Sequence, residues 1–225
     1  MINVNKKYLV GFILVYFAFS IVHIYYLSNL SPETIHYDLF HVPSIVVTNR
    51  LNVTSIIMLM IWLLPNMLVW IYGNYLFHRY YSTCVIFFVT RGKKIETILN
   101  QIELVILAIT VFVSVLKFLL GIMMVQNFAL SAYAILYLLL YIVLSFGIIN
   151  LAILGYLVTK SSKALAIMIL LVMAVVVVST YYPENIFVLL MKMNALELLM
   201  ANLVCIIINM LIIWGSRIRL KTIDY

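Results

Sequence analysis

The residues of this chain that could do chemistry are few and widely spaced. His36, Asp38 and His41 fall close together, and two imidazoles with a carboxylate between them are ligands that transition metals accept. Lys117 stands alone inside a long apolar run, where an ammonium group could reach the headgroups, pair with a carboxylate or line a cavity in the membrane. Because single histidines in loops are usually solvated, we expect no metal at His36 and His41.

No motif for catalysis accompanies these residues. The chain lacks GxSxG and HExxH motifs, and Gly92-Lys93-Lys94 lacks the upstream glycine and the hydroxyl residue of a phosphate-binding GxxxxGK[ST] loop. Its two cysteines, Cys84 and Cys205, have no CxxC spacing. The sequence therefore predicts no catalytic residue, no cofactor and no metal in this chain, and we do not expect it to be an enzyme that hydrolyses ATP.

The composition is that of an integral membrane protein. Of 225 residues, 67% are hydrophobic and 9% are charged, whereas soluble domains carry about 25% charged residues. Several apolar runs reach the roughly 20 residues that cross a bilayer as a helix. We therefore expect an all-α, polytopic protein of a cell membrane, the plasma membrane of a bacterium.

The apolar runs predict a single transmembrane domain, residues 1–225, with six transmembrane helices. The longest run has 31 residues, or roughly 46 Å of helix at about 1.5 Å per residue. One tilted helix accounts for that length better than two spans, which need about 40 residues. The predicted spans lie at about 8–27, 53–77, 102–125, 128–158, 164–181 and 196–214.

The distribution of Lys and Arg orients the spans. With the amino terminus in the cytoplasm, 11 of the 14 basic residues flank the spans on the cytoplasmic side and two on the outer side. This bias predicts that both termini are cytoplasmic. Basic residues beside a membrane also contact anionic lipid headgroups, so membrane lipids are an expected partner and nucleic acid is not.

The largest cytoplasmic segment, residues 78–101, combines apolar and basic residues. Its apolar run should lie in the membrane interface as a short helix, and a second helix should lead into the third span. The bases serve either to set the topology or to dock a cytoplasmic partner, and the overall layout favours docking. The residues that would couple to such a partner are Phe87, Phe88, Arg91, Gly92, Lys93 and Lys94.

In this layout the chain resembles the permease subunits of ATP-binding-cassette exporters of the type-2, six-helix kind. The run FFVTRGKKIETILNQ is similar to the family's coupling segment, which has apolar residues, a basic turn and then a helix. Residues 182–197 would be the re-entrant segment that the family carries on the outer side. One departure is the start, where seven residues are too few for the family's amino-terminal interfacial helix.

The resemblance implies a function and partners. A separate cytoplasmic ATPase subunit would bind ATP and Mg²⁺ and hold the coupling segment, and a second copy of the permease or a related permease would complete the path. Alternating access would then export an amphipathic peptide or a lipid-like compound, because the spans carry few charges. The alternatives are an accessory or immunity subunit that transports nothing and, less favoured, a membrane-embedded enzyme.

Polar residues within or beside the spans are the remaining candidates for a translocation path or hinge. We expect the stem of Lys117 to carry its amine toward the outer headgroups, the alternatives being an ion pair with Glu184 or Glu197 or a place in a cavity wall. Pro65 should kink the second span, as a fixed bend or as a hinge. Asn66 beside it should satisfy a freed backbone group.

Three more expectations concern packing. Glu103 should lie at the inner interface near Lys94 or Arg219, and His23 should be hydrogen-bonded within the bundle. Gly147 should allow two helices to pack closely. Hydrogen bonds between helices are expected for Asn150, Asn202 and Asn209.

Overall fold

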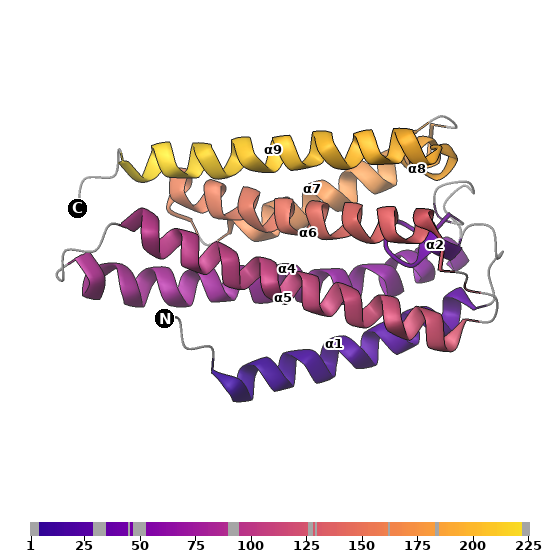
Figure 1. Ribbon diagram of the computed structural model, residues 1–225, viewed down its shortest axis with the longest axis horizontal. Helices are drawn as coiled ribbons and strands as arrows, with labels where there is room; N and C mark the ends of the chain where they lie inside the picture. Colours follow the sequence, from indigo (N-terminus) through magenta and orange to yellow (C-terminus); the bar gives the residue numbers. More distant parts are fainter. Residues whose placement is uncertain are drawn as a thin grey trace.

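The chain folds into helices throughout the residues that a computed structural model describes, and no strand forms among them. These residues are 5–28, 35–44, 46, 53–89, 95–125, 128, 130–161, 163–182 and 185–221, the side chains of 82–89, 95 and 221 excepted. In chain order the helices are α1 (Lys6–Leu27), α2 (Ile35–Asp38), α4 (Val53–Val89), α5 (Ile95–Met124), α6 (Ala132–Thr159), α7 (Ala164–Ser179), α8 (Ile186–Lys192) and α9 (Ala195–Lys221) (Figure 1).

Five of these helices are long and apolar enough to cross a membrane, namely α1, α4, α5, α6 and α9. This architecture is that of a multi-pass, all-α membrane protein and confirms that part of the prediction. The fifth predicted span corresponds to α7, which is apolar but has 16 residues, or about 24 Å of helix against a hydrocarbon core of about 30 Å.

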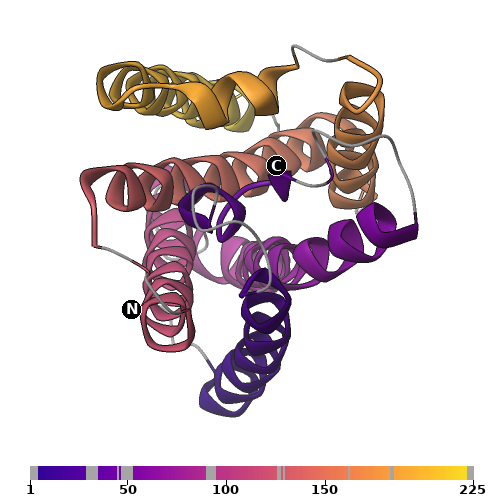
Figure 2. The same cartoon turned by 90° about the vertical axis from the view of Figure 1, so that its right-hand side faces the viewer.

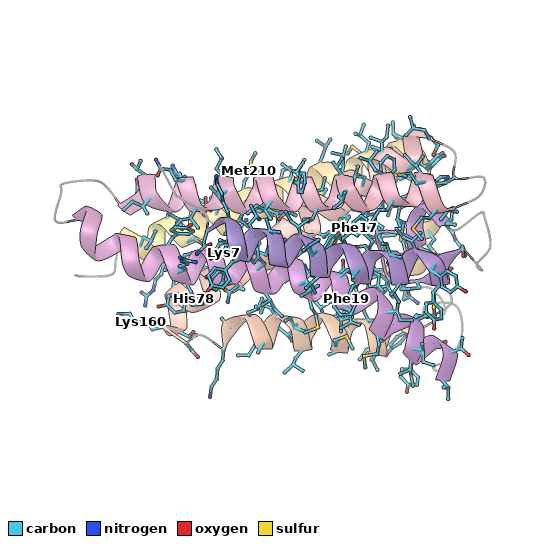
Figure 3. All side chains as sticks on the ribbon, turned by 90° about the horizontal axis from the view of Figure 1, so that it is seen from below. Lys7, Phe17, Phe19, His78, Lys160 and Met210 are labelled. Atoms are coloured by element: carbon cyan, nitrogen blue, oxygen red, sulfur yellow. The ribbon has the colours of Figure 1, made fainter. Side chains whose placement is uncertain are left out.

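The amino-terminal and carboxy-terminal helices begin and end at the same end of the bundle, which we call the terminal end. Successive long helices alternate in direction, and α2 and α8 lie at the opposite end, the α2 end (Figure 1). Lys7, His78 and Lys160 lie toward the terminal end (Figure 3). Basic residues that the sequence assigns to the cytoplasmic side are therefore found together at one end.

Polar residues at the α2 end fix where α8 and α9 begin. Asn185 accepts hydrogen bonds from the first free N–H groups of α8 at 3.0 and 3.1 Å. At α9, Asn194 Oδ1 accepts from the N–H of Glu197 at 3.0 Å, and the Glu197 carboxylate accepts from the N–H of Asn194 at 2.9 Å. This reciprocal arrangement is a capping box. Glu197 therefore caps a helix instead of pairing with Lys117.

The core lies between α1, α4, α5 and α6 and the segment around α2, whereas the outer helix surfaces carry exposed apolar side chains. α9 is the most exposed helix, with 11% of its most apolar stretch buried. Seen along the bundle, it forms a layer outside α6 (Figure 2). Such surfaces suit contact with lipid tails, which are as apolar as the side chains themselves.

Two asparagines seven residues apart attach α9 to α6. Asn202 Nδ2 donates to the carbonyl of Leu136 at 3.2 Å, and Asn209 Nδ2 donates to the carbonyl of Val143 at 3.0 Å. A Cβ on Gly147 would come within 3.0 Å of the Asn209 amide, so only glycine allows this approach without a shift. The predicted hydrogen bonds of Asn202 and Asn209 and the close packing at Gly147 are confirmed, whereas the one predicted for Asn150 is wrong, because its side-chain amide has no partner among the described residues.

We expect Gly147→Ala to lower the free energy of unfolding by about 1–3 kcal/mol, because the added methyl group must displace the Asn209 amide. Gly11→Ala is the matched control, since a Cβ there meets nothing within 4 Å. Denaturant unfolding in detergent measures both variants. The double variant Gly147→Ala/Asn209→Ala should lose less than the sum of its parts, because the clash disappears with the amide. Equal stability of the two glycine variants would contradict this packing.

An ion pair gives α9 a second attachment near the terminal end. Arg217 on α9 donates to the carboxylate of Glu103 on α5 at 2.9 Å, and the Glu103 side chain is 7% exposed. Glu103 was expected near Lys94 or Arg219, and the ion pair that it forms in the structure is with Arg217, a residue of the same predicted tail. Lys94 lies outside the described residues.

Candidate functional site

Lys117 lies inside the bundle. Its side chain has no exposed surface, and Nζ lies 5.4 Å from the centroid of the Tyr141 ring and 5.9 Å from that of Phe40. Nζ has no hydrogen-bond partner among the described residues. The prediction that its stem carries the amine toward the headgroups is wrong, because neighbouring helices enclose the whole side chain. Its predicted partner Glu184 lies outside the described residues.

The buried face of α5 positions Lys117. Thr110, Ser114 and Lys117 are spaced by four and three residues and therefore share one side of the helix. Thr110 Oγ1 donates to the carbonyl of Ile106 at 2.9 Å, and Ser114 Oγ donates to the carbonyl of Thr110 at 2.6 Å. Both hydroxyls donate within their own helix, and the ammonium group has no hydrogen-bond partner among the described residues.

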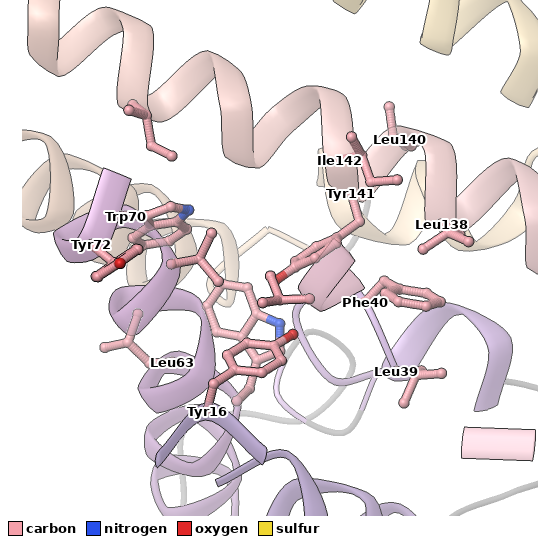
Figure 4. Close-up of a cluster of buried hydrophobic side chains, with 14 of the residues drawn as sticks. Tyr16, Leu39, Phe40, Leu63, Trp70, Tyr72, Leu138, Leu140, Tyr141 and Ile142 are labelled. Atoms are coloured by element: carbon pink, nitrogen blue, oxygen red, sulfur yellow. The ribbon is translucent and has the colours of Figure 1, made fainter. Parts of the chain in front are cut away.

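A polar face of α1 meets this site from another side. Tyr16, Ser20 and His23 follow at helical spacing and have no exposed surface. His23 lies beside Lys117, and Tyr16 lies beside Ser20 and Tyr141; Figure 4 shows the two tyrosines approaching each other from α1 and α6. Both ring nitrogens of His23 have no hydrogen-bond partner among the described residues. The hydrogen bond expected for His23 is therefore absent there.

Asn66 and Tyr141 join α4 to α6. The Tyr141 hydroxyl donates to Asn66 Oδ1 at 2.7 Å, and Asn66 Nδ2 donates to the carbonyl of Trp62 at 2.7 Å. Pro65, which lies within α4, frees the carbonyl four residues earlier, that of Ile61. The expectation that Asn66 satisfies the freed group is wrong, since its amide bonds the next carbonyl along. Its structural role is to hold the Tyr141 hydroxyl.

These residues form a polar cluster that is rich in hydrogen-bond donors, which we call the central cluster. The surplus comes from Lys117, because an ammonium group offers three donors and no acceptor, whereas the hydroxyl, imidazole and amide groups can each donate and accept. The buried carboxylates among the described residues have other partners, because Asp38 accepts from the N–H and Oγ of Ser44 at 2.6 and 2.9 Å and Glu103 pairs with Arg217. The cluster consists of Tyr16, Ser20, His23, Asn66, Lys117 and Tyr141.

An apolar cavity of about 340 Å³ adjoins the central cluster, between α4, α6 and α7. Asn66 and Tyr141 belong to both the cluster and the cavity wall. The other lining residues with polar side-chain atoms are His41, Ser145, Trp62 and Trp70, and the rest of the wall is aliphatic, phenylalanine or methionine. A largely apolar pocket with a few convergent polar groups is the usual form of a small-molecule site.

The histidines of the segment around α2 have separate aromatic neighbours. The ring centroids of His36 and Phe128 are 4.6 Å apart, and those of His41 and Tyr37 are 5.2 Å apart. Within the described residues no three His, Cys, Asp or Glu side chains gather as metal ligands. Burial lowers the pKa of His41 to about 3, well below the ordinary value of about 6.5.

The pKa of His41 makes stability depend on pH. The unfolded chain binds a proton at His41 below about pH 6.5, whereas the folded chain does so only near pH 3. The contribution of neutral, buried His41 to the free energy of unfolding is therefore fully present above pH 6.5 and is lost as the pH falls toward 3. Between pH 7.5 and pH 5 we expect a loss of about 2 kcal/mol from this residue. Unfolding of His41→Gln in detergent should show a flatter pH dependence than the native chain; an unchanged slope would refute the assignment.

The predicted coupling segment continues a long helix. α4 runs without a break to Val89, so Phe87 and Phe88 belong to its last turns, and the predicted separate interfacial helix is instead the end of α4. Arg91, Gly92, Lys93 and Lys94 lie outside the described residues. In the predicted re-entrant segment, α8 is a helix of seven residues between α7 and α9.

Comparison with known proteins yields no relative. No family model matches the chain, and no curated protein and no solved structure matches it. The function of the chain is therefore inferred from its own geometry.

Tyr16, Ser20 and Tyr141 belong to the central cluster but are not among the residues that the sequence singles out. The spacing of Tyr16, Ser20 and His23 on an otherwise apolar helix is a usable signal, because it places three polar groups on one face. Tyr141 has no comparable local signal. Its role depends on contacts with Asn66 and Lys117, which are far from it in the sequence.

Proposed function

We propose that the chain is the permease subunit of an ATP-binding-cassette exporter, and that its substrate is an amphipathic peptide or a lipid-like compound. The observation that carries the proposal is the cavity of about 340 Å³ between α4, α6 and α7. Its wall is mainly apolar and offers only a few polar groups, so it suits a molecule with an apolar chain and a small polar end. A highly charged, water-soluble cargo would find few partners there.

The arrangement of the helices supports the same function. α4 ends and α5 begins at the terminal end (Figure 1), where Lys7 and Lys160 also lie (Figure 3), and this is the side on which a cytoplasmic ATPase would reach the coupling segment. The six longer helices then cross the plasma membrane with both termini in the cytoplasm. α8 would lie on the outer side, as the resemblance implies for a re-entrant segment.

The proposed mechanism divides the labour between subunits. A separate ATPase binds ATP and Mg²⁺, and its closure moves the coupling segment at residues 78–101. A second copy of this chain, or a related permease, completes the path. This chain supplies the cavity, and alternation of the helices around the cavity exposes it first to one side of the membrane and then to the other.

Affinity purification from the native membrane in mild detergent tests the proposal. We expect an ATPase to co-purify, and we expect amphiphiles to stimulate its ATP turnover when both subunits are reconstituted in vesicles. Absence of any ATPase from the purified material would reject the exporter. An ATPase that co-purifies but moves no amphiphile across the vesicle membrane would favour the accessory or immunity subunit instead.

A further inference from the structure

We propose that the cavity and the central cluster form one binding site for an anionic amphiphile with a single apolar chain. The chain of the ligand lies in the cavity, and its carboxylate or phosphate group faces Lys117. This inference rests on the proposed function, because it names the class of substrate that the cavity accepts. It adds a role for the buried Lys117, which the transport proposal leaves unexplained.

The two parts of the site share a wall. Phe40 and Tyr141 both line the cavity, and their ring centroids lie 5.9 and 5.4 Å from Lys117 Nζ. Lys117 itself does not line the cavity, so it lies behind these two rings. His41, which also lines the cavity, is close enough to Lys117 to feel its charge. An anionic group held against this wall would therefore be separated from the ammonium group by little more than one ring.

The positive charge of Lys117 in the central cluster favours a ligand that accepts hydrogen bonds. Lys117 Nζ and both nitrogens of His23 are buried without partners among the described residues. An unpaired cation in a region of low dielectric constant is costly, and an anion nearby offsets that cost. Electrostatic attraction also acts over a longer distance in such a region than in water. A negative group is thus the ligand chemistry that this cluster favours.

The wall of the cavity indicates that the anion carries an apolar chain. Apart from its few polar groups, the cavity is lined by side chains such as Ile148, Met168 and Val172, which offer a small inorganic ion nothing. Leu171 and Val175 line the cavity and are also 51% and 54% exposed on the outside of α7. The cavity therefore reaches the lipid-facing surface, and an amphiphile could enter it sideways from the membrane.

Quenching of tryptophan fluorescence by a brominated acyl chain tests the site directly. Trp62 and Trp70 line the cavity, whereas Trp214 is exposed on α9, so the experiment uses a Trp214→Phe background. A stearic acid brominated at mid-chain is titrated into the purified protein in detergent at neutral pH, in parallel with the alcohol of the same brominated chain. We expect the acid to reach half-maximal quenching at about one tenth of the alcohol concentration. A single-chain alkyl phosphate with the same bromination shows which headgroup is preferred.

Variants of Lys117 decide the outcome. Lys117→Met should remove the preference for the acid, and Lys117→Arg, which keeps the charge, should retain it. Lys160→Met at the terminal end is the matched control and should behave like the native chain. Equal quenching by acid and alcohol in the native chain, or an unchanged preference in Lys117→Met, would overturn the inference. Protection against unfolding by chloride or inorganic phosphate alone, without quenching by the brominated acid, would identify a small anion as the occupant and also overturn it.

The result is separable from the transport proposal. Selective binding of the acid in a chain that recruits no ATPase would leave the site standing and reject the exporter. Transport without selective binding of the acid would support the exporter and reject the proposed binding site.

Discussion

Replacing Phe87 and Phe88 together with Asp is expected to abolish ATP-driven export while the helices stay inserted in the membrane. Both residues lie in the last turns of α4, at the end of the bundle that we assign to the cytoplasm. If the two rings are buried in a groove of the ATPase, each contributes about 1.5–3 kcal/mol of apolar contact. Their loss weakens the association by about a hundredfold to ten-thousandfold.

The measurement is ATP turnover and ATPase retention after purification of the variant. Phe87→Leu/Phe88→Leu is the matched control, because it keeps an apolar surface of similar size and should retain most of the association. Protease accessibility of the terminal segments reports whether insertion is intact. An Asp variant that binds the ATPase and exports at the native rate would remove the docking role from this segment.

Tyr141→Ala is expected to cause the largest loss of stability, about 3–5 kcal/mol. Tyr141 is buried, donates a hydrogen bond to Asn66, and contacts Phe40 with ring centroids 5.4 Å apart. Truncation would leave a hole beside the cavity, an unpaired Asn66 oxygen and one wall fewer around Lys117. All three effects lower the free energy of unfolding, and all three follow from the loss of this one side chain.

Tyr141→Phe separates the ring from the hydroxyl. It keeps the packing and removes only the hydrogen bond to Asn66, so we expect a loss of about 1–2 kcal/mol. Denaturant unfolding in the same detergent compares the two variants. If Tyr141→Phe were as unstable as Tyr141→Ala, the hydroxyl would dominate and the packing argument would fail.

The membrane architecture was predictable because its signal is local. An apolar run of about 20 residues can satisfy the hydrogen bonds of its backbone within a bilayer only as a helix. Each such run therefore predicts a helix without reference to the rest of the chain. The breaks are equally local, as Asn185 and Asn194 show by capping α8 and α9. α7 is the weakest case, since its 16 residues are apolar enough but too few to settle a crossing by length.

The candidate site was predictable only in part because its signal is not local. The sequence identifies Lys117 as an anomaly but cannot tell whether its stem reaches outward, and the enclosing partners come from α1, α6 and the segment around α2. Asn66 was linked to Pro65, its neighbour in the chain, whereas its decisive contact is Tyr141 on another helix. Glu197 shows the reverse error. It was given a distant partner, Lys117, whereas its contact in the structure is the local one with Asn194 at the start of α9.

The paired asparagines on α9 limit how that helix can move. Asn202 and Asn209 meet carbonyls of α6 that are also seven residues apart, so the next position in which both would meet carbonyls on the same face of α6 is a slip of one turn, about 5.4 Å along the axis. Any smaller slip breaks both bonds and drives the Asn209 amide away from the gap at Gly147. We therefore expect α6 and α9 to move together as one unit. Conformational change around the cavity would then occur mainly through movement of α4 and α7.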